Sequence, residues 1–424
     1  MADAPTPTSS TPTSPAPATS ASASAAPEET PKRRLPTALV YDPAFLDHLV
    51  PRGFPERPAR LVQAMAVIEA LIAEGTLPAE KLLRLAPRPA TRAELTTVHH
   101  DAYVERVRQT VELLMEGVGY EARPRAFDSE VFLSPGSYNA AVLAAGASLV
   151  ALDAIGERRA RNGYALVRPP GHHALPDLGM GFCIFNNVAV AARYAQQRWG
   201  WQRVLIVDYD VHHGNGTQEM FYDDPDVVYF STHQAVDADG MLFYPSTGQS
   251  TDVGTGKGAG TTINVPLPPE CGWSVFDPIF RQVLWPVADR LKPDVILLSA
   301  GFDAHWRDPM ADERLCTADY SDLTREVIEI ADRYCDGRIV AVQEGGYDLD
   351  VMGQCAATVL FALTGSDAVV DNLGEPPPLE SRWNEEAIIQ ALYQLHDLAG
   401  YRRKPRRPQV REGWTAPKTT PSGE

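Results

Sequence analysis

The chain has 424 residues, which is enough for one large α/β domain or two smaller ones around a full hydrophobic core. Its hydrophobic content of 44% and charged content of 22% are ordinary for a soluble globular enzyme. The net charge of -17 argues against nucleic acid as a direct ligand, because binding to a phosphate backbone needs a basic surface.

The two ends of the chain differ in composition from its middle. Residues 1–31 are almost wholly Ala, Pro, Ser and Thr, and such a segment buries too little apolar surface to offset its ordering entropy. We therefore expect a disordered tail over 1–34. Residues 401–424 are basic and rich in proline, and we expect a second flexible tail there. A single catalytic domain over 35–400 is the simplest arrangement of the rest.

The sequence shows no targeting signal. The amino terminus lacks the basic start and apolar core of a secretory signal, and we find no apolar run long enough to span a bilayer. We therefore expect a cytoplasmic protein without a membrane partner. The cysteines are odd in number and form no C-x-x-C pair, which favours a reducing compartment and argues against a cysteine-based metal site. They are Cys183, Cys271, Cys316, Cys335 and Cys355.

Apolar strand-like runs alternate with helical patterns between the two tails. The expected strands, in chain order, are Thr37–Tyr41, Gly163–Val167, Arg203–Val207, Val227–Ser231, Val295–Ser299 and Arg338–Val342. The expected helices are Arg57–Glu74, Pro135–Ile155, Asn187–Trp199, Trp273–Leu291, Tyr320–Cys335 and Met352–Leu363. This alternation predicts an α/β fold, a parallel sheet with helices on both of its faces.

Reactive polar residues follow four of the expected strands. In open α/β sheets, ligands bind beyond the carboxyl ends of the strands, so we expect these residues to meet at one edge of the sheet. The four clusters contain Arg168, His172 and His173; Asp208, Asp210, His212 and His213; Asp303; and Tyr347.

The spacing within the second cluster is typical of a metal site. If the strand that starts at Arg203 continues through it, Asp208, Asp210 and His212 share one face, because alternate side chains of a strand point the same way. A D-x-H pair with one more carboxylate gives three oxygen or nitrogen ligands, which suits a catalytic zinc with an open fourth position. We expect Asp303, at the end of a neighbouring strand, to be the third ligand. The alternative of helix caps and loop salt bridges requires several coincidences for the whole set.

Two further groups have the chemistry that amide hydrolysis requires. His172 and His173 follow a rigid Pro-Pro-Gly turn, and two imidazoles outside the metal shell can move a proton and steady developing charge. Tyr347 follows two glycines and can present its phenol to an oxyanion. Taken alone, the two histidines could be turn residues that face solvent, and Gly-Gly-Tyr could be a tight turn.

These motifs together resemble the signature blocks of the zinc-dependent histone deacetylase superfamily, which also includes acetylpolyamine amidohydrolases and acetoin-utilisation proteins. The resemblance covers most of residues 36–370, with the blocks in the right order. The blocks are RPPGHHA (168–174), GFCIFNN (181–187), VDYDVHHGNGTQ (207–218), LLSAGFDAH (297–305) and QEGGYD (343–348). The resemblance implies an α/β fold of the arginase–deacetylase type, a single three-layer domain with a mainly parallel eight-stranded sheet between helices.

The resemblance also implies a role for each reactive residue. It makes Asp210, His212 and Asp303 the zinc ligands, His173 the general base and acid, His172 its electrostatic partner, and Tyr347 the donor to the oxyanion. In the implied mechanism, water activated by zinc attacks the acyl carbonyl while His173 takes its proton, and His173 then protonates the departing amine.

The neighbours of the catalytic histidines are implied in the same way. Asp208 matches the carboxylate that hydrogen-bonds a catalytic histidine. It also matches one ligand of the family's structural potassium ion, whose site here would contain Asp208, Asp210, His212, Ser231 and Thr232. Asn215 stands at a position where class I enzymes carry Asp. Class II and bacterial members usually carry Asn there, so this residue groups the chain with them. A neutral amide behind His173 stabilises an imidazolium less than a carboxylate does.

The residues that would contact substrate match the family in part. Gly181 and Phe182 match one wall of the narrow acyl-lysine channel, and Tyr244 matches the opposite wall, with ordinary packing as the alternative for both aromatic rings. Phe54 replaces the His of the family's HPERPxR loop near the channel mouth. Met310 stands seven residues after Asp303, where polyamine-selective relatives of the class II type place a Glu, so it offers no charge to a second ammonium group.

Three functions remain open at this level. The first is a deacetylase that acts on acetyl-lysine in proteins or peptides, and the second is a deacylase for acetylated polyamines or similar small amides. The third is an inactive acyl-lysine binding protein, against which the intact set of ligands, histidines and Tyr347 argues. A binuclear arginase-like enzyme is disfavoured because the AGFDAH segment lacks a second bridging carboxylate. A homo-oligomer is left open.

Overall fold

The structure is a computed structural model in which residues 35–116, 123–379 and 384–398 are described. The tails expected at 1–34 and 401–424 lie outside the described residues. The described residues from Leu35 onward belong to one compact unit.

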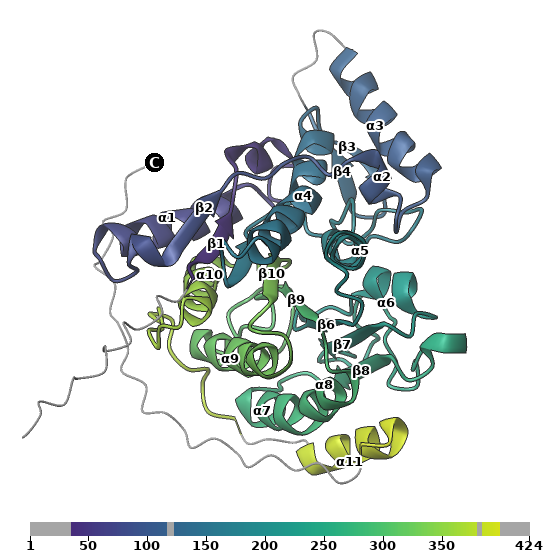
Figure 1. The fold of residues 1–424 in the computed structure, drawn as a ribbon, viewed down its shortest axis with the longest axis vertical. Helices are drawn as coiled ribbons and strands as arrows, with labels where there is room; N and C mark the ends of the chain where they lie inside the picture. The colour runs from purple at the N-terminus through teal and green to yellow at the C-terminus, as the bar shows by residue number, and fades with distance from the viewer. Residues whose placement is uncertain (1–34, 117–122, 380–383, 399–424) are drawn as a thin grey trace, which may run out of the picture. The chain divides into compact units, whose positions relative to one another are not determined.

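An eight-stranded sheet runs through this unit (Figure 1). Its strands are β1 (Thr37–Val40), β2 (Leu82–Leu85), β5 (Asn162–Ala165), β6 (Val204–Asp208), β7 (Val227–Gln234), β8 (Thr262–Leu267), β9 (Val295–Ala300) and β10 (Ile339–Gln343). Their order in the sheet is β2-β1-β5-β10-β9-β6-β7-β8, and every pairing is parallel. A separate antiparallel pair is formed by β3 (Arg125–Asp128) and β4 (Val131–Leu133). The parallel α/β sheet expected from the sequence is confirmed.

Helices cover both faces of the sheet and give the domain three layers (Figure 1). The α-helices are α1 (Ala59–Ala73), α2 (Arg92–Leu95), α3 (Asp101–Glu116), α4 (Ser137–Gly156), α5 (Asn187–Trp199), α6 (Asn215–Phe221), α7 (Trp273–Ile279), α8 (Trp285–Leu291), α9 (Thr317–Tyr334), α10 (Leu349–Leu363) and α11 (Glu385–His396). Short 3₁₀ segments are η1 (Pro43–Asp47), η2 (Ala79–Lys81) and η3 (Gly256–Gly258), and η4 (Phe280–Leu284) is π-helical. α4 and α5 pack together on one face, whereas α1, α10 and α9 lie in a row on the other.

The inner strands have unbroken apolar sequences because both of their faces are covered by helices. β6 reads VLIVD, β9 reads VILLSA and β10 reads IVAVQ, and all of their residues are buried. Capping residues bound the connecting helix α5. At the start of α5 the Asn186 side chain accepts a hydrogen bond from the N–H of Ala189, and Gly200 in the left-handed conformation ends that helix.

The sequence located the inner elements better than the edges. All of the expected strands are present, with ends shifted by a few residues, but β2 and β8 at the two edges of the sheet were missed. β2 is half-buried and its sequence LLRL does not alternate, so it carries no period-two signal. The single helix expected over Trp273–Leu291 was wrong, because this segment is divided into α7, η4 and α8. Pro278 and Pro286 lack the N–H that a continuous α-helix needs there.

The helix α4 corrects the expectation that no apolar run is long enough to span a bilayer. By length and composition Ser137–Gly156 meets that requirement, with a mean hydropathy of 1.6. However, 78% of its apolar window is buried inside the fold, where it packs on α5, β1 and β5. A buried core helix meets the same requirement, so α4 is weak evidence for a membrane span.

Candidate active site

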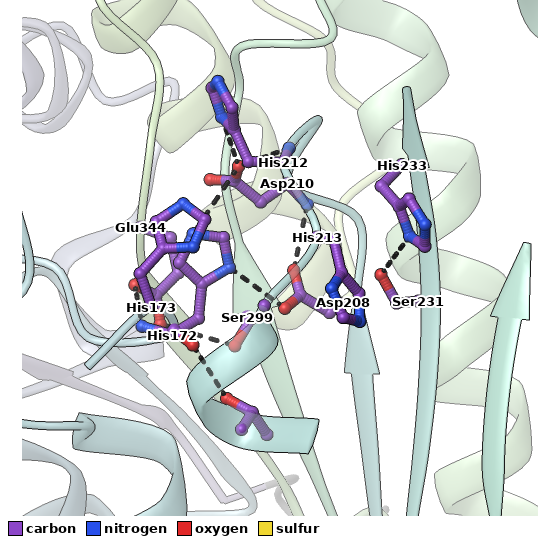
Figure 2. Close-up of polar contacts among 12 residues, drawn as sticks. His172, His173, Asp208, Asp210, His212, His213, Ser231, His233, Ser299 and Glu344 are labelled. Carbon is purple, nitrogen blue, oxygen red and sulfur yellow. Dashed lines mark hydrogen bonds and ion pairs between the residues drawn. The ribbon is translucent and has the colours of Figure 1, made fainter. Parts of the chain in front are cut away.

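The reactive residues lie beyond the carboxyl ends of consecutive strands, as the sequence predicted. The segments that carry them follow β5, β10, β9 and β6, which are neighbours in this order in the sheet. These segments bring together His172, His173, Asp208, Asp210 and His212 (Figure 2). They also bring Asp303 to Asp210 and His212, and Tyr347 within electrostatic range of Asp303. Arg168 is the exception within the first cluster. Its guanidinium is fully buried in a bidentate ion pair with Glu56, at 2.8 and 2.9 Å.

Three buried side chains form a cluster that could hold a metal ion. Asp210, His212 and Asp303 each offer one ligand atom, and these atoms lie within 4.8 Å of one another. Nδ1 of His212 is 3.1 Å from a carboxylate oxygen of Asp210 and 3.1 Å from one of Asp303. All of the cysteines are buried and free, and none belongs to this cluster. The donor set of two carboxylates and one imidazole fits a catalytic zinc ion.

Backbone groups hold the two carboxylates in place. Asp210 accepts hydrogen bonds from the N–H groups of His212 at 2.9 Å and Gly345 at 2.8 Å, and Asp303 accepts one from Val211 at 2.9 Å. Gly345 lies so close that an added Cβ would stand 2.1 Å from Asp303 Oδ2. A side chain at this position would therefore displace a ligand of the cluster.

Asp208 faces the same imidazole as Asp210, that of His172, but it does not belong to the metal cluster. β6 ends at Asp208, so the alternation of a strand does not continue to His212. The carboxylate of Asp208 instead lies 3.1 Å from Nδ1 of His172 and accepts a hydrogen bond from the hydroxyl of Tyr229 at 3.1 Å. Asp208 thus lies behind the tandem histidines and outside the cluster of three.

The cluster attracts positive charge. Burial alone would lower the pKa of His212, but Asp210 and Asp303 outweigh burial and raise it to about 10. Burial and the nearby charge of Asp210 raise the pKa of Asp303. Two carboxylates this close are stabilised by a cation between them, and a bound metal ion would take the place of the proton on His212.

The tandem histidines have opposite electrostatic environments (Figure 2). Burial alone would lower the pKa of His172, but the carboxylates of Asp210 and Asp208 raise it to about 10. Burial and the positive charges of His172 and His212 hold the pKa of His173 well below its usual value. At neutral pH His172 is therefore charged and His173 is a neutral base.

The tautomer of His173 follows from its partner. Nδ1 of His173 lies 2.8 Å from the side-chain oxygen of Asn215, whose amide nitrogen donates to the sulfur of Met180 at 3.2 Å. Because an amide oxygen only accepts, Nδ1 carries the hydrogen and the lone pair of His173 is on Nε2. Asn215 thus orients the ring as well as holding its tautomer.

Glu344 is a buried residue of the site that the sequence analysis did not single out. Its carboxylate accepts hydrogen bonds from the N–H groups of Gly171 at 2.7 Å and His172 at 3.2 Å (Figure 2). Burial raises the pKa of Glu344 to about 7, against the opposing charge of His172. It fixes the tandem-histidine turn to the end of β10. A lone acidic residue at the end of an apolar strand was the only signal for it.

Tyr347 lies in the loop between β10 and α10. Its ring stands 4.8 Å from the guanidinium of Arg60 and 5.7 Å from the ring of Phe182, and its N–H donates to Asp308 at 2.5 Å. Burial and Asp303 raise the pKa of Tyr347 well above its usual value, so the phenol remains protonated and can donate a hydrogen bond. The sequence analysis assigned no role to Arg60 or Asp308.

The aromatic residues expected to contact substrate surround this centre. The ring of Tyr244 lies 5.2 Å from that of His173 and 6.1 Å from that of His212. Gly181 packs so closely that an added Cβ would stand 2.3 Å from the ring of His173. Phe182, which follows Gly181, has a left-handed backbone with φ of 69°. Such strain in a non-glycine residue is typical of functional loops.

Comparison with known proteins agrees with this geometry. The histone deacetylase domain matches residues 54–363, well over half of the chain. The chain belongs to the histone deacetylase family. Histone deacetylase 14, chloroplastic, of Arabidopsis thaliana is 38% identical over 360 residues, which cover 81% of each chain. Polyamine deacetylase HDAC10 of Homo sapiens is 38% identical over 317 residues, which cover 74% of this chain and 45% of the human one.

A solved structure supports the same assignment. The crystal structure of the HDA15 HD domain matches with a TM-score of 0.74 at 35% identity, and the match covers 86% of this chain and 96% of that domain. Membership makes the chain an amide hydrolase of the deacetylase family. The family is zinc-dependent, which agrees with the cluster of Asp210, His212 and Asp303.

The substrate-side departures from the histone deacetylase family lie near the catalytic loops. The ring of Phe54 stands 4.9 Å from that of Phe182 and 5.1 Å from that of Phe132, so it extends the aromatic wall. Met310 is half-buried, and its N–H donates to Asp308 at 3.1 Å. Asp308 also accepts from Tyr347, so Met310 and Tyr347 are tied to the same carboxylate.

The residues implied as a potassium site are brought together only in part. Asp208 and Ser231 are directly paired across β6 and β7. The hydroxyl of Ser231 lies 2.9 Å from Nδ1 of His233, and the buried hydroxyl of Thr232 has no hydrogen-bond partner in the part of the chain that is described. The side chains of Asp210 and His212 belong to the metal cluster. Any contribution of theirs to a potassium site would come from the backbone.

Proposed function

We propose that this protein hydrolyses acetyl-lysine in peptides or proteins, with zinc held by Asp210, His212 and Asp303. The observation that carries the proposal is the position of the buried cluster beside a neutral histidine and a protonated tyrosine. The His173 ring lies 5.8 Å from that of the ligand His212. A base and a hydrogen-bond donor beside one metal site are the groups that hydrolysis of an amide requires, and this supports the proposal.

Each residue then has a distinct task. A zinc ion held by the cluster supplies Lewis acidity, which polarises the acyl carbonyl and makes an adjacent water more acidic. Nε2 of the neutral His173 takes the proton from the attacking water and later gives it to the departing amine. The charged His172 stabilises negative charge beside it, and the phenol of Tyr347 donates a hydrogen bond to the carbonyl oxygen as that oxygen becomes negative.

Two features favour acetyl-lysine over an acetylated polyamine. A polyamine carries a second ammonium group that needs a carboxylate, and Met310 offers none. Phe54 adds an apolar ring to the wall formed by Phe182. The alternative, a polyamine deacylase, is supported by Glu130, an exposed carboxylate near Tyr244. Burial and the charge of Glu130 raise the pKa of Tyr244 above its usual value. Equal identity to relatives named for histone and polyamine deacetylation does not separate the two.

We also propose a structural potassium ion near Asp208 and Ser231. The support is their pairing across adjacent strands and the unpartnered hydroxyl of Thr232. If the ion is present, replacing K⁺ by Na⁺ in the buffer lowers the melting temperature. An unchanged melting temperature in the two salts would refute it.

The test of the proposed function measures metal content and acetate release on the full chain. We expect about one zinc per chain, and faster release from an acetyl-lysine peptide than from an N-acetylated polyamine. Tyr347→Phe should lower turnover by about 10²- to 10³-fold, because it removes one donor to the oxyanion. Tyr194→Phe, which removes from α5 a hydroxyl that donates to Asp153 on α4, is the matched control and should keep full activity. Absence of hydrolysis of both substrates with zinc supplied would overturn the enzyme assignment.

A further inference from the structure

Asp308 lies in the loop that follows β9, five residues beyond the metal-cluster residue Asp303. It is 5% exposed, and its carboxylate accepts three backbone hydrogen bonds. One oxygen accepts from Tyr347 at 2.5 Å and from Asp348 at 3.1 Å, and the other accepts from Met310 at 3.1 Å. Among the described residues no cation pairs with Asp308, so backbone N–H groups supply its stabilisation.

Side chains from other elements anchor the loop that carries Tyr347. Arg60 donates to the carbonyl oxygen of Gly346 at 2.6 Å, and Asp308 accepts from the N–H of Tyr347 itself. Gly345 and Gly346 precede Tyr347, and because both are glycines this part of the backbone has no side chains to pack. Gly346 also has φ of 106°, a conformation that favours glycine. Tyr347 also lies outside α10, which begins after its N-cap residue Asp348. The hydrogen bond to Asp308 therefore fixes the backbone of Tyr347 at a point where no regular element does so.

The same carboxylate determines where Met310 lies. Its second oxygen closes a local turn from residue 308 to the N–H of residue 310. The backbones of Tyr347, the proposed oxyanion donor, and of Met310, the residue expected to bear on substrate choice, are therefore held by one side chain. A rotation of Asp308 would move the two together.

We propose that Asp308 is a positioning residue, which holds the phenol of Tyr347 at the reacting carbonyl and fixes the backbone of Met310 in the adjoining turn. This inference rests on the proposed function, because it requires that Tyr347 donates to the oxyanion. None of the hydrogen bonds that Asp308 makes among the described residues joins it to Asp210, His212 or Asp303. Its effect on turnover is exerted through Tyr347.

The first variant is Asp308→Asn in the full chain, assayed at pH 8. Burial and Asp303 raise the pKa of Asp308 to about 7, so its carboxylate is ionised under this condition. Asparagine keeps the shape but replaces one acceptor oxygen by an NH₂ group, which must face a backbone N–H. We expect kcat to fall about 10- to 100-fold, since small misplacements of a catalytic group have effects of this size, whereas KM stays within about twofold.

A double-mutant cycle shows whether the loss passes through Tyr347. In the Tyr347→Phe background, Asp308→Asn should lower turnover by less than about twofold, because the hydroxyl that it positions is already absent. A peptide carrying trifluoroacetyl-lysine, whose carbonyl is more electrophilic, keeps the residual rates measurable. Equal losses from Asp308→Asn in both backgrounds would show a structural role only and would overturn the inference.

Amide hydrogen exchange gives a readout that does not depend on activity. In Asp308→Asn and in Asp308→Ala, the amides of Tyr347 and Asp348 should exchange faster than in the wild type. Asp319→Asn is the matched control, because Asp319 is similarly buried and accepts from the N–H of Cys316 at the start of α9. It should leave exchange at Tyr347 and kcat unchanged.

The outcomes separate the inference from the function on which it rests. Wild-type kcat in Asp308→Asn, with slow turnover in Tyr347→Phe, overturns the positioning role and leaves the proposed function intact. Wild-type turnover in Tyr347→Phe overturns the donor assignment, and the inference falls with it. The inference is supported if three results occur together. Asp308→Asn lowers kcat, its effect is not additive with that of Tyr347→Phe, and the amide of Tyr347 exchanges faster.

Discussion

The metal cluster and the rim of the site are held in different ways. The cluster residues Asp210 and Asp303 are fully buried, and each accepts backbone hydrogen bonds. The rim, defined as Phe54, Phe182, Tyr244 and Met310, is partly exposed. Ring contacts hold its aromatic residues, and a hydrogen bond to Asp308 holds the backbone of Met310. We therefore expect the chemistry to depend on the buried cluster and its backbone donors, and the choice of substrate to depend on individual rim side chains. A substitution in the cluster should abolish turnover, and one in the rim should change only the choice of substrate.

The largest effect is expected in the cluster itself. Asp303→Ala removes one of the three ligands and leaves Asp210 and His212, so bound zinc should fall well below that of the wild type and acetate release should fall to background. Metal analysis after gel filtration, together with an acetate assay, checks both. Asp153→Asn, a half-buried carboxylate on α4, is the control for a general loss of stability. Normal turnover in Asp303→Ala would show that the cluster is not the reaction centre.

A smaller effect is expected between the two regions, at Asn215. Asn215→Asp places a carboxylate against Nδ1 of His173 and should raise the pKa of that histidine from its lowered value. His173 must be neutral to act as a base, so the acidic limb of kcat/KM should move to higher pH, by about one unit, and activity below the limb should fall. A pH–rate profile measures this shift. An unmoved acidic limb would contradict the assignment of His173 as the base.

A change in the rim should alter preference and leave the chemistry intact. Met310→Glu adds a carboxylate that can attract the second ammonium of a polyamine. A partly exposed pair contributes about 1 kcal/mol, so the ratio of kcat/KM for an N-acetylated polyamine over an acetyl-lysine peptide should rise about fivefold. Met310→Gln, which has a similar shape and no charge, should leave the ratio unchanged. An equal rise in both variants would show that charge is not the cause.

The smallest effect on catalysis is expected outside both regions, at Glu313. This carboxyl is 3% exposed. The backbone N–H of Cys271 lies near it, but neither oxygen has a hydrogen bond of good geometry among the described residues. Burial raises the pKa of Glu313 well above its usual value, and the N–H of Cys271 offsets only part of this. Because the folded pKa exceeds the unfolded one, wild-type stability is full below about pH 4.5 and falls as pH rises towards the folded pKa.

Glu313→Gln removes that pH dependence. The difference in unfolding free energy between the variant and the wild type should grow by on the order of 1 kcal/mol per pH unit above about pH 4.5, with activity unchanged. Denaturant unfolding at pH 5 to 8 measures it, and Glu219→Gln on the surface is the control. A pH-independent difference would mean that Glu313 is ionised in the folded protein.

The inner part of the fold and the cluster could be predicted because their signals are local. Fully buried parallel strands have continuous apolar sequences, and the reactive residues follow each strand directly along the chain. The edge strand β2 and the interruption of the helix over 273–291 were not predicted. Half-burial removes the periodic pattern of β2, and prolines alter the helix type over 273–291.

The residues that hold the catalytic groups could not be predicted for a different reason. Glu344 binds the N–H of Gly171 across 173 positions of the chain, and Asp308 binds the N–H of Tyr347 across 39. A carboxylate that accepts backbone hydrogen bonds needs no particular residue type in its partner, so the sequence records only one half of such a contact. Three-dimensional structure is required to find it.

The most direct test of this account is to strip the protein of metal with a chelator and titrate zinc back while measuring acetate release from an acetyl-lysine peptide. The account predicts that the metal-free chain is inactive and that activity rises with added zinc to a plateau at about one zinc per chain. Asp303→Ala should recover none of it. Full turnover by the metal-free chain, or recovery of Asp303→Ala to the wild-type plateau, would contradict the central claim that Asp210, His212 and Asp303 hold the catalytic metal.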